Sequence, residues 1–566
     1  MNELKRKKID MKTVRWIIHT ASSSAGSLAA LFLVKVMQGF VGICFAFLLR
    51  AIIDAAANAD TAAFRKGLVL CAIIIAAEVF LYWFAIYYKD KPAAVLTKNI
   101  KSMIFGELLL RSYSEVSKVH TGEWMTRINS DAAIIASAIT AIVPGTAGLI
   151  VQLVCAFAAM FLVLPRLAWL LIPLGGAMLA VSLIMRLKLK AFHMEVQKNE
   201  GISYSFLQES LGSMRIIRAY TRETLTRKEA EDRLDGVVDA KLRRTRFICL
   251  CASCVYAFVR ISYYLGVVVC GFRLLDGVIT YGMMAAVLQL IRQADLPLSE
   301  VTTAVPQFFN MIASAERLME IEKLPPDHTG IVRTPKEARS CYDSDLESIG
   351  LSDVCFRYSE EDAENVVSHL DLEIRKGDCV AFTGESGCGK STTMNLLMGL
   401  YKPESGRLFV KRRGRGEEEL DAGWRALFAY VPQENLLMSG RIRDIVAFAD
   451  PGSVGEDEKI WEALRIACAE VFVRELPEGI DTELGERGAG LSEGQMQRIA
   501  IARAIFSDRP VLMLDEATSA LDEDTERQLL DNLQAVTDRT VVIITHRPAA
   551  LRICNRRIAF RKGDVS

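Results

Sequence analysis

The stretch Gly384-Glu385-Ser386-Gly387-Cys388-Gly389-Lys390-Ser391 decides the fold of the last third of the chain. It lies between a short apolar run, Asp378–Thr383, and a helix-like segment, Ser391–Leu400. Glycines at this spacing let the backbone close around phosphates, so that amides and the start of the following helix face the anion. We expect Lys390 to hold the β- and γ-phosphates of a nucleotide and the Ser391 hydroxyl to ligate Mg²⁺. The alternative is a chance glycine-rich turn.

Two more apolar runs, Pro510–Asp515 and Thr540–Thr545, alternate with helix-like segments in the same region. Strands that alternate with helices favour an α/β domain with a largely parallel sheet. Asp515 ends the first of these runs, where its carboxylate can reach Mg²⁺, and Glu516 follows it directly. The alternative for these two residues is an acidic pair at the start of a helix.

The composition indicates a membrane protein. The 566 residues are 51% hydrophobic and have a mean hydropathy of +0.23, which is more apolar than a soluble chain of this length. The formal net charge is +0, so bulk charge gives no indication of nucleic-acid binding. The 13 cysteines are scattered and lie mostly in apolar stretches, which fits a reducing cytoplasm and a lipid-buried region better than a secreted disulfide scaffold.

Six stretches before residue 315 are long and apolar enough to cross a bilayer, which takes about 20 residues. They are Leu28–Leu49, Gly67–Tyr88, Ala132–Leu164, Leu167–Leu187, Phe247–Leu275 and Val278–Met311. We interpret the first as an uncleaved span and not as a signal peptide. The third and sixth are too long for one crossing, so either can project from the membrane as a continuous helix. The loops after the second and fourth spans are long and basic, which predicts that these loops and both ends of the chain are cytoplasmic.

Hydropathy falls sharply after Met319, and the next segment carries many charges together with Pro325, Pro326 and Pro335. Such a composition is typical of a linker. We therefore predict a transmembrane domain over residues 1–319, a linker over 320–345 and a nucleotide-binding domain over 346–566. The predicted fold class is an all-α membrane domain of six helices followed by an α/β P-loop ATPase domain.

The phosphate loop is followed by three further motifs, Leu491-Ser492-Glu493-Gly494-Gln495, Val511–Glu516 and Ile544-Thr545-His546-Arg547. In this order they resemble the nucleotide-binding domain of an ABC transporter. With six preceding spans, nearly the whole chain resembles a half-size ABC transporter of the exporter-type fold, and its compact size suggests a bacterial one. The membrane half adds three short matches, Thr121-Gly122-Glu123 before Arg127 and Asp131, Gln208-Glu209-Ser210, and Ala315-Glu316-Arg317.

The resemblance implies roles for residues around the phosphate loop. Glu516 is implied as the general base or water-positioning carboxylate, and His546 and Lys390 as contacts of the γ-phosphate. Thr392 belongs to the predicted nucleotide-binding stretch, and Tyr358 is implied to stack on adenine. The implied Mg²⁺ ligands are Ser391, Gln433 and Asp515.

In the resembled family the signature closes over ATP that is held by a partner subunit. Ser492, Gly494 and Gln495 are the implied contacts, with Asp522 at the same dimer seam. The family's usual residue at position 493 is glycine, and Glu493 departs from it. We expect its side chain to point away from phosphate, because a carboxylate beside it would be repelled.

The predicted function is export of an unidentified substrate across the cytoplasmic membrane, driven by ATP and Mg²⁺ in a dimer. The second half-transporter is either an identical chain or a paralogue, and no nucleic acid is expected as a partner. An importer on the same fold and an ATP-gated channel or regulator are the alternatives. The tips of the two long loops, near Ser112–Val119 and Ser210–Ile217, are the candidate coupling helices.

Polar residues inside the spans allow two interpretations. Charges there are costly and usually face the bundle interior or water; these are Lys35, Glu78, Arg260, Arg292 and Asp295. Arg292 and Asp295 are either a structural pair on one helix face or part of a substrate-contacting patch. Cys249, Cys251 and Cys254 are either small apolar helical residues or a metal or thiol-conjugate site.

Overall fold

The computed structural model describes residues 11–328, 330–359, 364–433, 437–485, 488, 490–535, 538–561 and 564–565. Within the long helices it leaves out the side chains of residues 143, 147, 178–187, 190 and 295–306. The chain divides into two compact units. The first comprises residues 1–107 and 121–323, and the second comprises residues 108–120 and 324–566.

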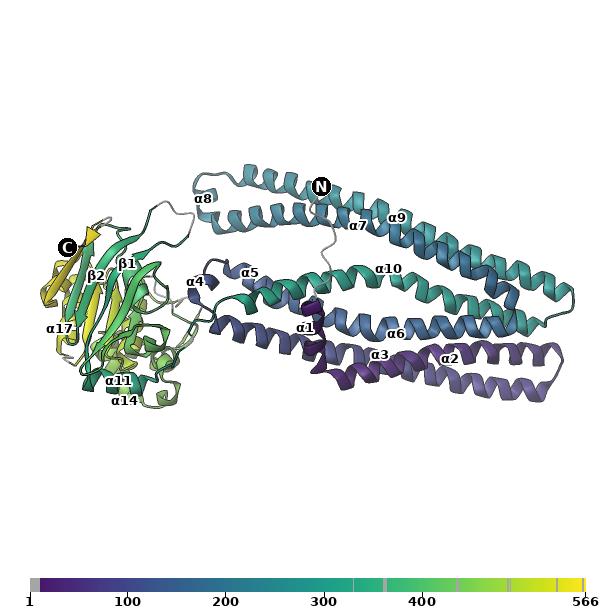
Figure 1. The fold of residues 1–566 in the computed structure, drawn as a ribbon, viewed down its shortest axis with the longest axis horizontal. Helices are drawn as coiled ribbons and strands as arrows, with labels where there is room; N and C mark the ends of the chain where they lie inside the picture. Colours follow the sequence, from purple (N-terminus) through teal and green to yellow (C-terminus); the bar gives the residue numbers. More distant parts are fainter. Residues whose placement is uncertain are drawn as a thin grey trace. The chain divides into compact units, whose positions relative to one another are not determined.

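The first unit is built from long helices that run alongside one another, as Figure 1 shows. The α6 helix packs against α2 and α10, and α7 packs along α9. The elements are α1 (Met11–Ser22), α2 (Ala25–Ala57), α3 (Thr61–Leu110), α5 (Thr121–Thr126), the π-helical turn η1 (Arg127–Asp131), α6 (Ala132–Val163), α7 (Pro165–Gly212), α8 (Met214–Ala219), α9 (Glu223–Leu275) and α10 (Tyr281–Lys323).

The six predicted spans fall on the long helices α2, α3, α6, α7, α9 and α10, except that residues 278–280 precede α10 and Leu164 follows α6. Among the described residues, four helical stretches are long and apolar enough to cross a membrane by length and composition. These are Ala25–Ala57, Thr61–Leu110, Thr121–Val163 and Glu223–Leu275. The helices α7 and α10 include the residues 178–187 and 295–306 whose side chains are not described.

The segments that we expected to be long loops are mostly helical. The α3 helix continues past its apolar part to Leu110, α7 continues to Gly212, and α9 begins at Glu223. Hydropathy shows where a helix leaves the lipid and does not show where the helix ends. The extensions contain lysine, glutamate, leucine and alanine, which are good helix formers, so each helix continues beyond its apolar part. The true turns are short and carry α4 (Tyr113–Val116) and α8 at the two predicted tips.

Two of the short motifs in the membrane half meet in space. The carboxylate of Asp131, at the end of η1, accepts hydrogen bonds from Arg317 Nε at 2.9 Å and from Ser314 Oγ at 2.8 Å on α10. The Asp131 side chain is only 4% exposed, so this pairing compensates a buried charge. It fixes the start of α6 to the end of α10.

The second unit contains two main sheets. The larger has the strand order β12-β11-β3-β10-β9-β6, and all its neighbours are parallel except β11 and β12, which confirms the predicted α/β architecture. Its strands are β3 (Cys379–Gly384), β6 (Phe428–Val431), β9 (Val511–Asp515), β10 (Thr540–Ile544), β11 (Arg556–Arg561) and β12 (Asp564–Val565).

The second main sheet is antiparallel and was not predicted. Its order is β2-β1-β4-β5, from the strands β1 (Leu346–Phe356), β2 (Val367–Arg375), β4 (Ser405–Arg412) and β5 (Gly416–Glu419). A small third sheet pairs β7 (Gly440–Arg441) with β8 (Glu483–Leu484). The main helices of this unit are α11 (Pro335–Ser344), α12 (Lys390–Leu397), α13 (Ile442–Val446), α14 (Asp457–Ile466), α15 (Glu470–Glu475), α16 (Glu493–Phe506), α17 (Glu523–Ala535) and α18 (Pro548–Ile553).

The predicted linker contains regular structure. Its first residues belong to α10, which ends at Lys323, and its last ten or so form α11. The start of α11 is a capping box, in which Thr334 Oγ1 accepts from the Glu337 amide at 3.3 Å and Glu337 Oε2 accepts from the Thr334 amide at 2.8 Å. The domain boundaries remain predictions.

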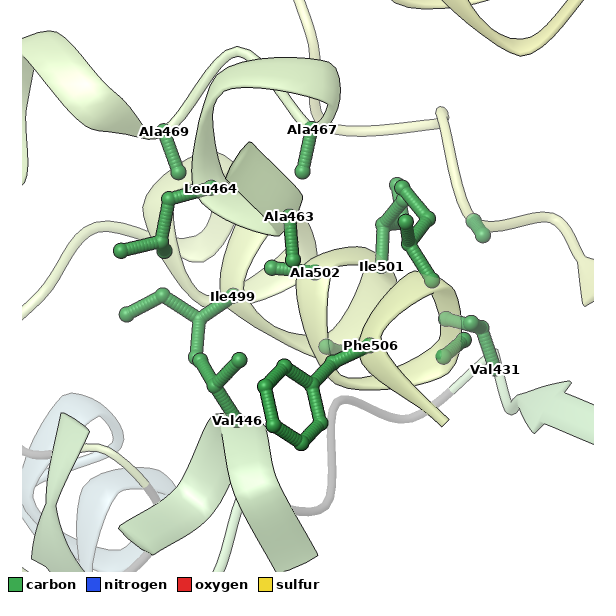
Figure 2. Packing of buried hydrophobic residues seen from close by; sticks show 14 of the residues in the cluster. Val431, Val446, Ala463, Leu464, Ala467, Ala469, Ile499, Ile501, Ala502 and Phe506 are labelled. Carbon is green, nitrogen blue, oxygen red and sulfur yellow. The ribbon is translucent and has the colours of Figure 1, made fainter. Parts of the chain in front are cut away.

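A buried hydrophobic cluster fixes α16, the helix that begins at the signature. Figure 2 shows Ile499, Ala502 and Phe506 of α16 packed beside Ala463 and Leu464 of α14. Burying a large apolar side chain contributes about 1.5–3 kcal/mol. The cluster therefore holds the direction of α16 and, with it, the position of the signature at its first turn.

Candidate nucleotide site

The phosphate loop connects β3 to α12, and its glycines are required by the backbone. Gly384 has φ +142°, and a Cβ there would collide with the carbonyl oxygen of Phe560 on the neighbouring β11. Gly389 has φ +94°, and a Cβ there would lie 2.9 Å from the Val366 carbonyl oxygen. Residues that carry a side chain rarely adopt such backbone angles. The loop can therefore keep its shape only with glycine at these two positions.

Lys390 points its ammonium group into this loop. Its Nζ donates to the carbonyl oxygens of Gly384 at 2.7 Å and Glu385 at 2.8 Å, and lies 3.8 Å from Cys388 Sγ. The residue is only 6% exposed, so its charge is held among backbone carbonyls and away from bulk water. A cation in such a position attracts an anion strongly, because the surroundings screen it weakly.

The predicted metal ligands Ser391 and Asp515 lie together. Ser391 Oγ on α12 donates a hydrogen bond at 3.1 Å to Oδ1 of Asp515, the last residue of β9. Tyr430 lies on β6, which neighbours β9, and its hydroxyl is 3.5 Å from Asp515 Oδ2. Burial raises the pKa of Asp515 above its ordinary range, and burial together with the nearby Asp515 charge raises that of Tyr430. A buried carboxylate beside a hydroxyl is a donor set that suits Mg²⁺.

Glu516 lies one residue beyond this pair in an unusual conformation. Its φ is +48°, a left-handed angle that costs a non-glycine residue free energy, and its amide donates to the Ile544 carbonyl oxygen at 3.1 Å. Its Oε2 accepts a hydrogen bond from Gln433 Nε2 at 2.9 Å. The backbone turn therefore moves the Glu516 side chain away from Asp515 and toward the segment that carries Gln433.

His546 lies just after β10, the strand whose Ile544 carbonyl oxygen accepts the hydrogen bond from the Glu516 amide. It lies two residues after Ile544, the last residue of β10, and is exposed. The strands β9 and β10 are parallel neighbours, with Ile544 opposite Asp515. Their carboxyl ends therefore place His546 and Glu516 at the same edge of the sheet.

Tyr358 lies beside α12 and within an aromatic group. Its hydroxyl shares a hydrogen bond of 2.9 Å with Thr392 Oγ1, and its ring centroid is 5.3 Å from that of Tyr401. The Tyr401 ring in turn contacts Tyr113 on α4, with the centroids 5.7 Å apart. Tyr358 and Tyr401 border a cavity of about 280 Å³, which Ser112, Lys118 and Glu404 also line. The first candidate coupling helix, α4, thus contacts Tyr401, which lies beside Tyr358, the predicted adenine contact.

The signature forms the start of α16. Ser492 caps the helix, since its Oγ accepts from the Gln495 amide at 3.3 Å while Gln495 Oε1 accepts from the Ser492 amide at 2.8 Å. A Cβ on Gly494 would lie 2.8 Å from the Ala520 carbonyl oxygen, so the helix can approach the segment before Asp522 only with glycine there. Ser492 and Glu493 are both exposed.

Asp522 caps the next helix. Its Oδ1 accepts from the Thr525 amide at 2.9 Å, and this hydrogen bond lowers the pKa of Asp522 below its ordinary value. A carboxylate at a helix N-terminus is stabilised by the free amides of the first turn. Asp522 is therefore ionised and fixed in position at the start of α17.

Sequence reasoning missed two residues that hold this region together. Gln497 is fully buried; its Nε2 donates to Ser519 Oγ at 3.1 Å and its Oε1 accepts from the Ala520 amide at 3.1 Å. Arg547 donates to the carbonyl oxygens of Ser519 at 2.6 Å and Leu521 at 2.8 Å. Gln497 lies two residues after Gln495, and Arg547 directly follows His546. This closeness to predicted site residues was the signal in the sequence that could have identified them.

The comparisons with known proteins match both parts of the chain. Residues 28–294 match the ABC transporter transmembrane region family, and residues 367–519 match the ABC transporter family of ATP-binding domains. Together these matches cover well over half of the chain. This chain belongs to the ABC transporters. A solved structure of a bacterial Atm1-family ABC exporter with ATP bound superposes with a TM-score of 0.83 over 95% of this chain and 94% of the other, at 21% sequence identity, which shows the exporter-type fold.

Relatives of this ABC transporter come from several organisms. The ATP-dependent lipid A-core flippase of Desulfotalea psychrophila is 28% identical over 88% of this chain and 85% of the relative. The ABC transporter B family member 1 of Dictyostelium discoideum is 26% identical over the whole of this chain and 62% of its own length. A multidrug resistance protein of Entamoeba histolytica is 37% identical over 49% of this chain, but only 20% of that relative is covered. The chain thus spans only part of some of its relatives.

The polar residues within the spans of the transporter have different surroundings. Arg260 Nε donates to Tyr256 Oη at 2.8 Å one turn earlier on α9, Lys35 is half-buried, and Glu78 and Arg292 are exposed. The side chain of Asp295 lies outside the described residues, so its predicted pairing with Arg292 stays a prediction.

The cysteine cluster near the start of the fifth span lies on α9. Cys249 is exposed, while Cys251 and Cys254 are half-buried, all on α9. In the part of the chain that the structure describes, no three histidine, cysteine, aspartate or glutamate residues come together as metal ligands would. Both interpretations of the cluster stay predictions.

Proposed function

We propose that this chain hydrolyses ATP and uses the energy to move a substrate outward across the cytoplasmic membrane by alternating access in a dimer. The observation that carries the proposal is the position of Glu516. Its left-handed backbone and its hydrogen bond from Gln433 at 2.9 Å separate it from the buried Asp515 next to it. Two adjacent carboxylates are thereby given different surroundings, one suited to a metal and one to a water molecule.

The residues present fit ATP with Mg²⁺. Lys390 and the loop amides would hold the phosphates, and Ser391, Asp515 and Gln433 would hold the ion. When bound, Mg²⁺ supplies positive charge against the developing charge on the phosphates. Glu516 would orient the attacking water and accept its proton, and His546 would contact the γ-phosphate. Tyr358 would stack on the base.

A second subunit supplies the other half of each site in this proposal. Ser492, Gly494 and Gln495 at the start of α16 would close over ATP held by the partner, with Asp522 at the seam. Glu493 starts α16 and is exposed, so its carboxylate has room to turn away from a bound phosphate. The partner is an identical chain or a paralogous half-transporter, and both are compatible with these residues.

The tips of the long helices would transmit the closure to the membrane. The α4 helix contacts Tyr401 beside the predicted adenine site, so nucleotide binding and the position of α4 are linked within the second unit. The α8 helix is the second coupling candidate. Outward transport is supported by the lipid A-core flippase of Desulfotalea psychrophila and by a leukotoxin translocation protein of Mannheimia haemolytica, which is 31% identical over 64% of this chain and 50% of its own length. The bilayer and an unidentified substrate complete the proposed set of partners.

The test is the Mg²⁺-dependent ATPase activity of the chain in lipid nanodiscs, alongside Glu516→Gln and with the particle mass measured. Loss of a general base lowers rates by roughly 10²–10⁴-fold. We expect an active dimer whose mutant binds ATP with unchanged affinity but loses hydrolysis to that extent. Unchanged turnover in Glu516→Gln would refute the assignment, and a monomer or an inactive dimer would indicate that a paralogous partner is missing.

A further inference from the structure

Two cysteines of the second unit lie in contact although they are far apart in sequence. Cys379 is the first residue of β3, and Cys554 follows α18 directly. Their Sγ atoms are 3.3 Å apart, and both residues are half-buried. Among 13 cysteines spread over the chain, such a contact brings two nucleophilic groups together at a place that the nucleotide site does not use.

The backbone holds this pair in place. The strands β3 and β11 are parallel neighbours, with Val380 opposite Arg556. Cys379 comes one residue before Val380 and Cys554 two residues before Arg556, so both cysteines lie at the same end of this strand pair. The Cys379 amide donates to Asn555 Oδ1 at 3.1 Å, next to Cys554 itself. A disulfide has a sulfur–sulfur bond of about 2.05 Å, so the sulfurs need to approach by only about 1.3 Å.

The contact between the two sulfurs changes the pKa of each thiol. The hydrogen bond with Cys554 lowers the pKa of Cys379, against the opposing effects of burial and of the Asp378 charge. The same hydrogen bond and burial raise the pKa of Cys554. Because its sulfur lies 3.3 Å away, Cys554 is placed to react with Cys379 once Cys379 has been oxidised. In the reducing cytoplasm disulfides are rare, and those that form are usually transient or redox-sensing.

We propose that Cys379 and Cys554 are a redox-modification site that forms a reversible disulfide with a peroxide as oxidant. The Cys379 thiolate attacks one peroxide oxygen, the O–O bond breaks, and the products are a sulfenic acid on Cys379 and, after protonation, water. Cys554 Sγ then attacks Cys379 Sγ and displaces hydroxide, which leaves as water with the Cys554 proton. Each sulfur loses one electron in total, and the peroxide takes up two and becomes two waters.

The disulfide would join two segments of the nucleotide-binding fold. Cys379 begins the strand that ends at Gly384 of the phosphate loop, and Cys554 ends the segment that starts after His546. A covalent link here closes a very long stretch of chain, which stabilises the folded state mainly by restricting the unfolded one. We therefore expect oxidation to raise the thermal unfolding midpoint of this unit.

The experiment treats the reduced full-length protein in nanodiscs with hydrogen peroxide, blocks the remaining thiols by alkylation and maps disulfides by mass spectrometry without reduction. We expect a Cys379–Cys554 peptide that has lost two hydrogen atoms and that a phosphine reductant splits. Cys341 is the matched control; it is half-buried on α11, and burial raises its pKa to about 11. It should remain alkylatable throughout.

Two variants separate the roles of the thiols. In Cys554→Ser the oxidised Cys379 has no resolving partner, so a sulfenic-acid probe should label it. In Cys379→Ser the labelling of Cys554 should fall to the level of Cys341. The proposal is overturned if Cys379 and Cys554 stay as alkylatable as Cys341 in the folded wild type, or if they pair with other cysteines. The mapping of the wild type decides the matter even if a variant fails to fold, and it does not depend on ATPase activity.

Discussion

The side-chain amide of Gln433 donates a hydrogen bond to Oε2 of Glu516 at 2.9 Å. This bond joins the segment after β6 to the residue after β9, and β6 and β9 are parallel neighbours. The carboxylate that is proposed to orient the attacking water is thus held by the residue that is proposed to contact the metal. Occupancy of the metal site and the orientation of the base are therefore linked by one contact.

The first prediction concerns this contact. In Gln433→Ala the Glu516 carboxylate loses a hydrogen bond of a kind worth about 1.5–3 kcal/mol. We expect kcat for ATP hydrolysis to fall roughly tenfold or more. Gln433→Glu keeps the size of the side chain but places a second negative charge beside Glu516, and it should be at least as slow. Steady-state kinetics with both variants checks this, and a wild-type kcat in Gln433→Ala would contradict it.

The second prediction concerns the arginine after His546. Arg547 pairs with Glu526 at 3.1 Å, and the Glu526 side chain is 3% exposed. Thr518 Oγ1 also donates to Glu526, at 2.8 Å. In Arg547→Ala the Glu526 carboxylate stays buried without its cation. The carbonyl oxygens of Ser519 and Leu521 also lose the hydrogen bonds that Arg547 donates to them. We expect a loss of about 2 kcal/mol of stability, seen as a fall of roughly 5 °C in the unfolding midpoint of this unit.

The matched control for Arg547 is a double variant. Glu526→Gln combined with Arg547→Ala removes the buried charge together with its cation, so part of the lost stability should return. If Arg547→Ala and the double variant unfold at the same temperature, the Glu526 charge contributes nothing and the network acts only through the backbone contacts. Thermal denaturation monitored by intrinsic fluorescence of the purified protein distinguishes these results.

The sequence predicted the parts of the fold that depend on local composition. The six long helices and the parallel sheet follow from apolar runs, whereas short helices at the two tips were expected from the resemblance to the family. The lengths of α3, α7 and α9 did not follow, because charged residues that leave the lipid continue the helix equally well. The antiparallel sheet was missed because the pairing of β1 with β4 joins segments about 60 residues apart. Tyr430, Gln497 and Arg547 were missed for a similar reason, since only the fold brings them to their partners.

The third prediction concerns the aromatic group around Tyr358. Tyr401 touches Tyr358 on one side and Tyr113 of α4 on the other, with ring centroids 5.3 and 5.7 Å apart. Such pairs are each worth about 0.5–1.5 kcal/mol beyond the area they bury. Tyr401→Ala should therefore weaken binding of a fluorescent ATP analogue by roughly threefold to tenfold. Tyr401→Phe keeps both ring contacts and should bind as the wild type does. Equal affinities of all three proteins would show that the ring does not support Tyr358.

The fourth prediction concerns the cysteine inside the phosphate loop. Cys388 is 7% exposed, and its Sγ lies 3.8 Å from Lys390 Nζ. An alkyl group on this sulfur would fill the space that the phosphates need, so ATPase activity should fall in proportion to labelling of Cys388. Bound ATP should slow that labelling, because it covers the loop. Cys341 on α11, away from the phosphate loop, provides the control, since its labelling should proceed at the same rate with and without ATP. Cys388→Ala, compared with its own untreated activity, should resist the reagent; equal inhibition of this variant would place the sensitive thiol elsewhere.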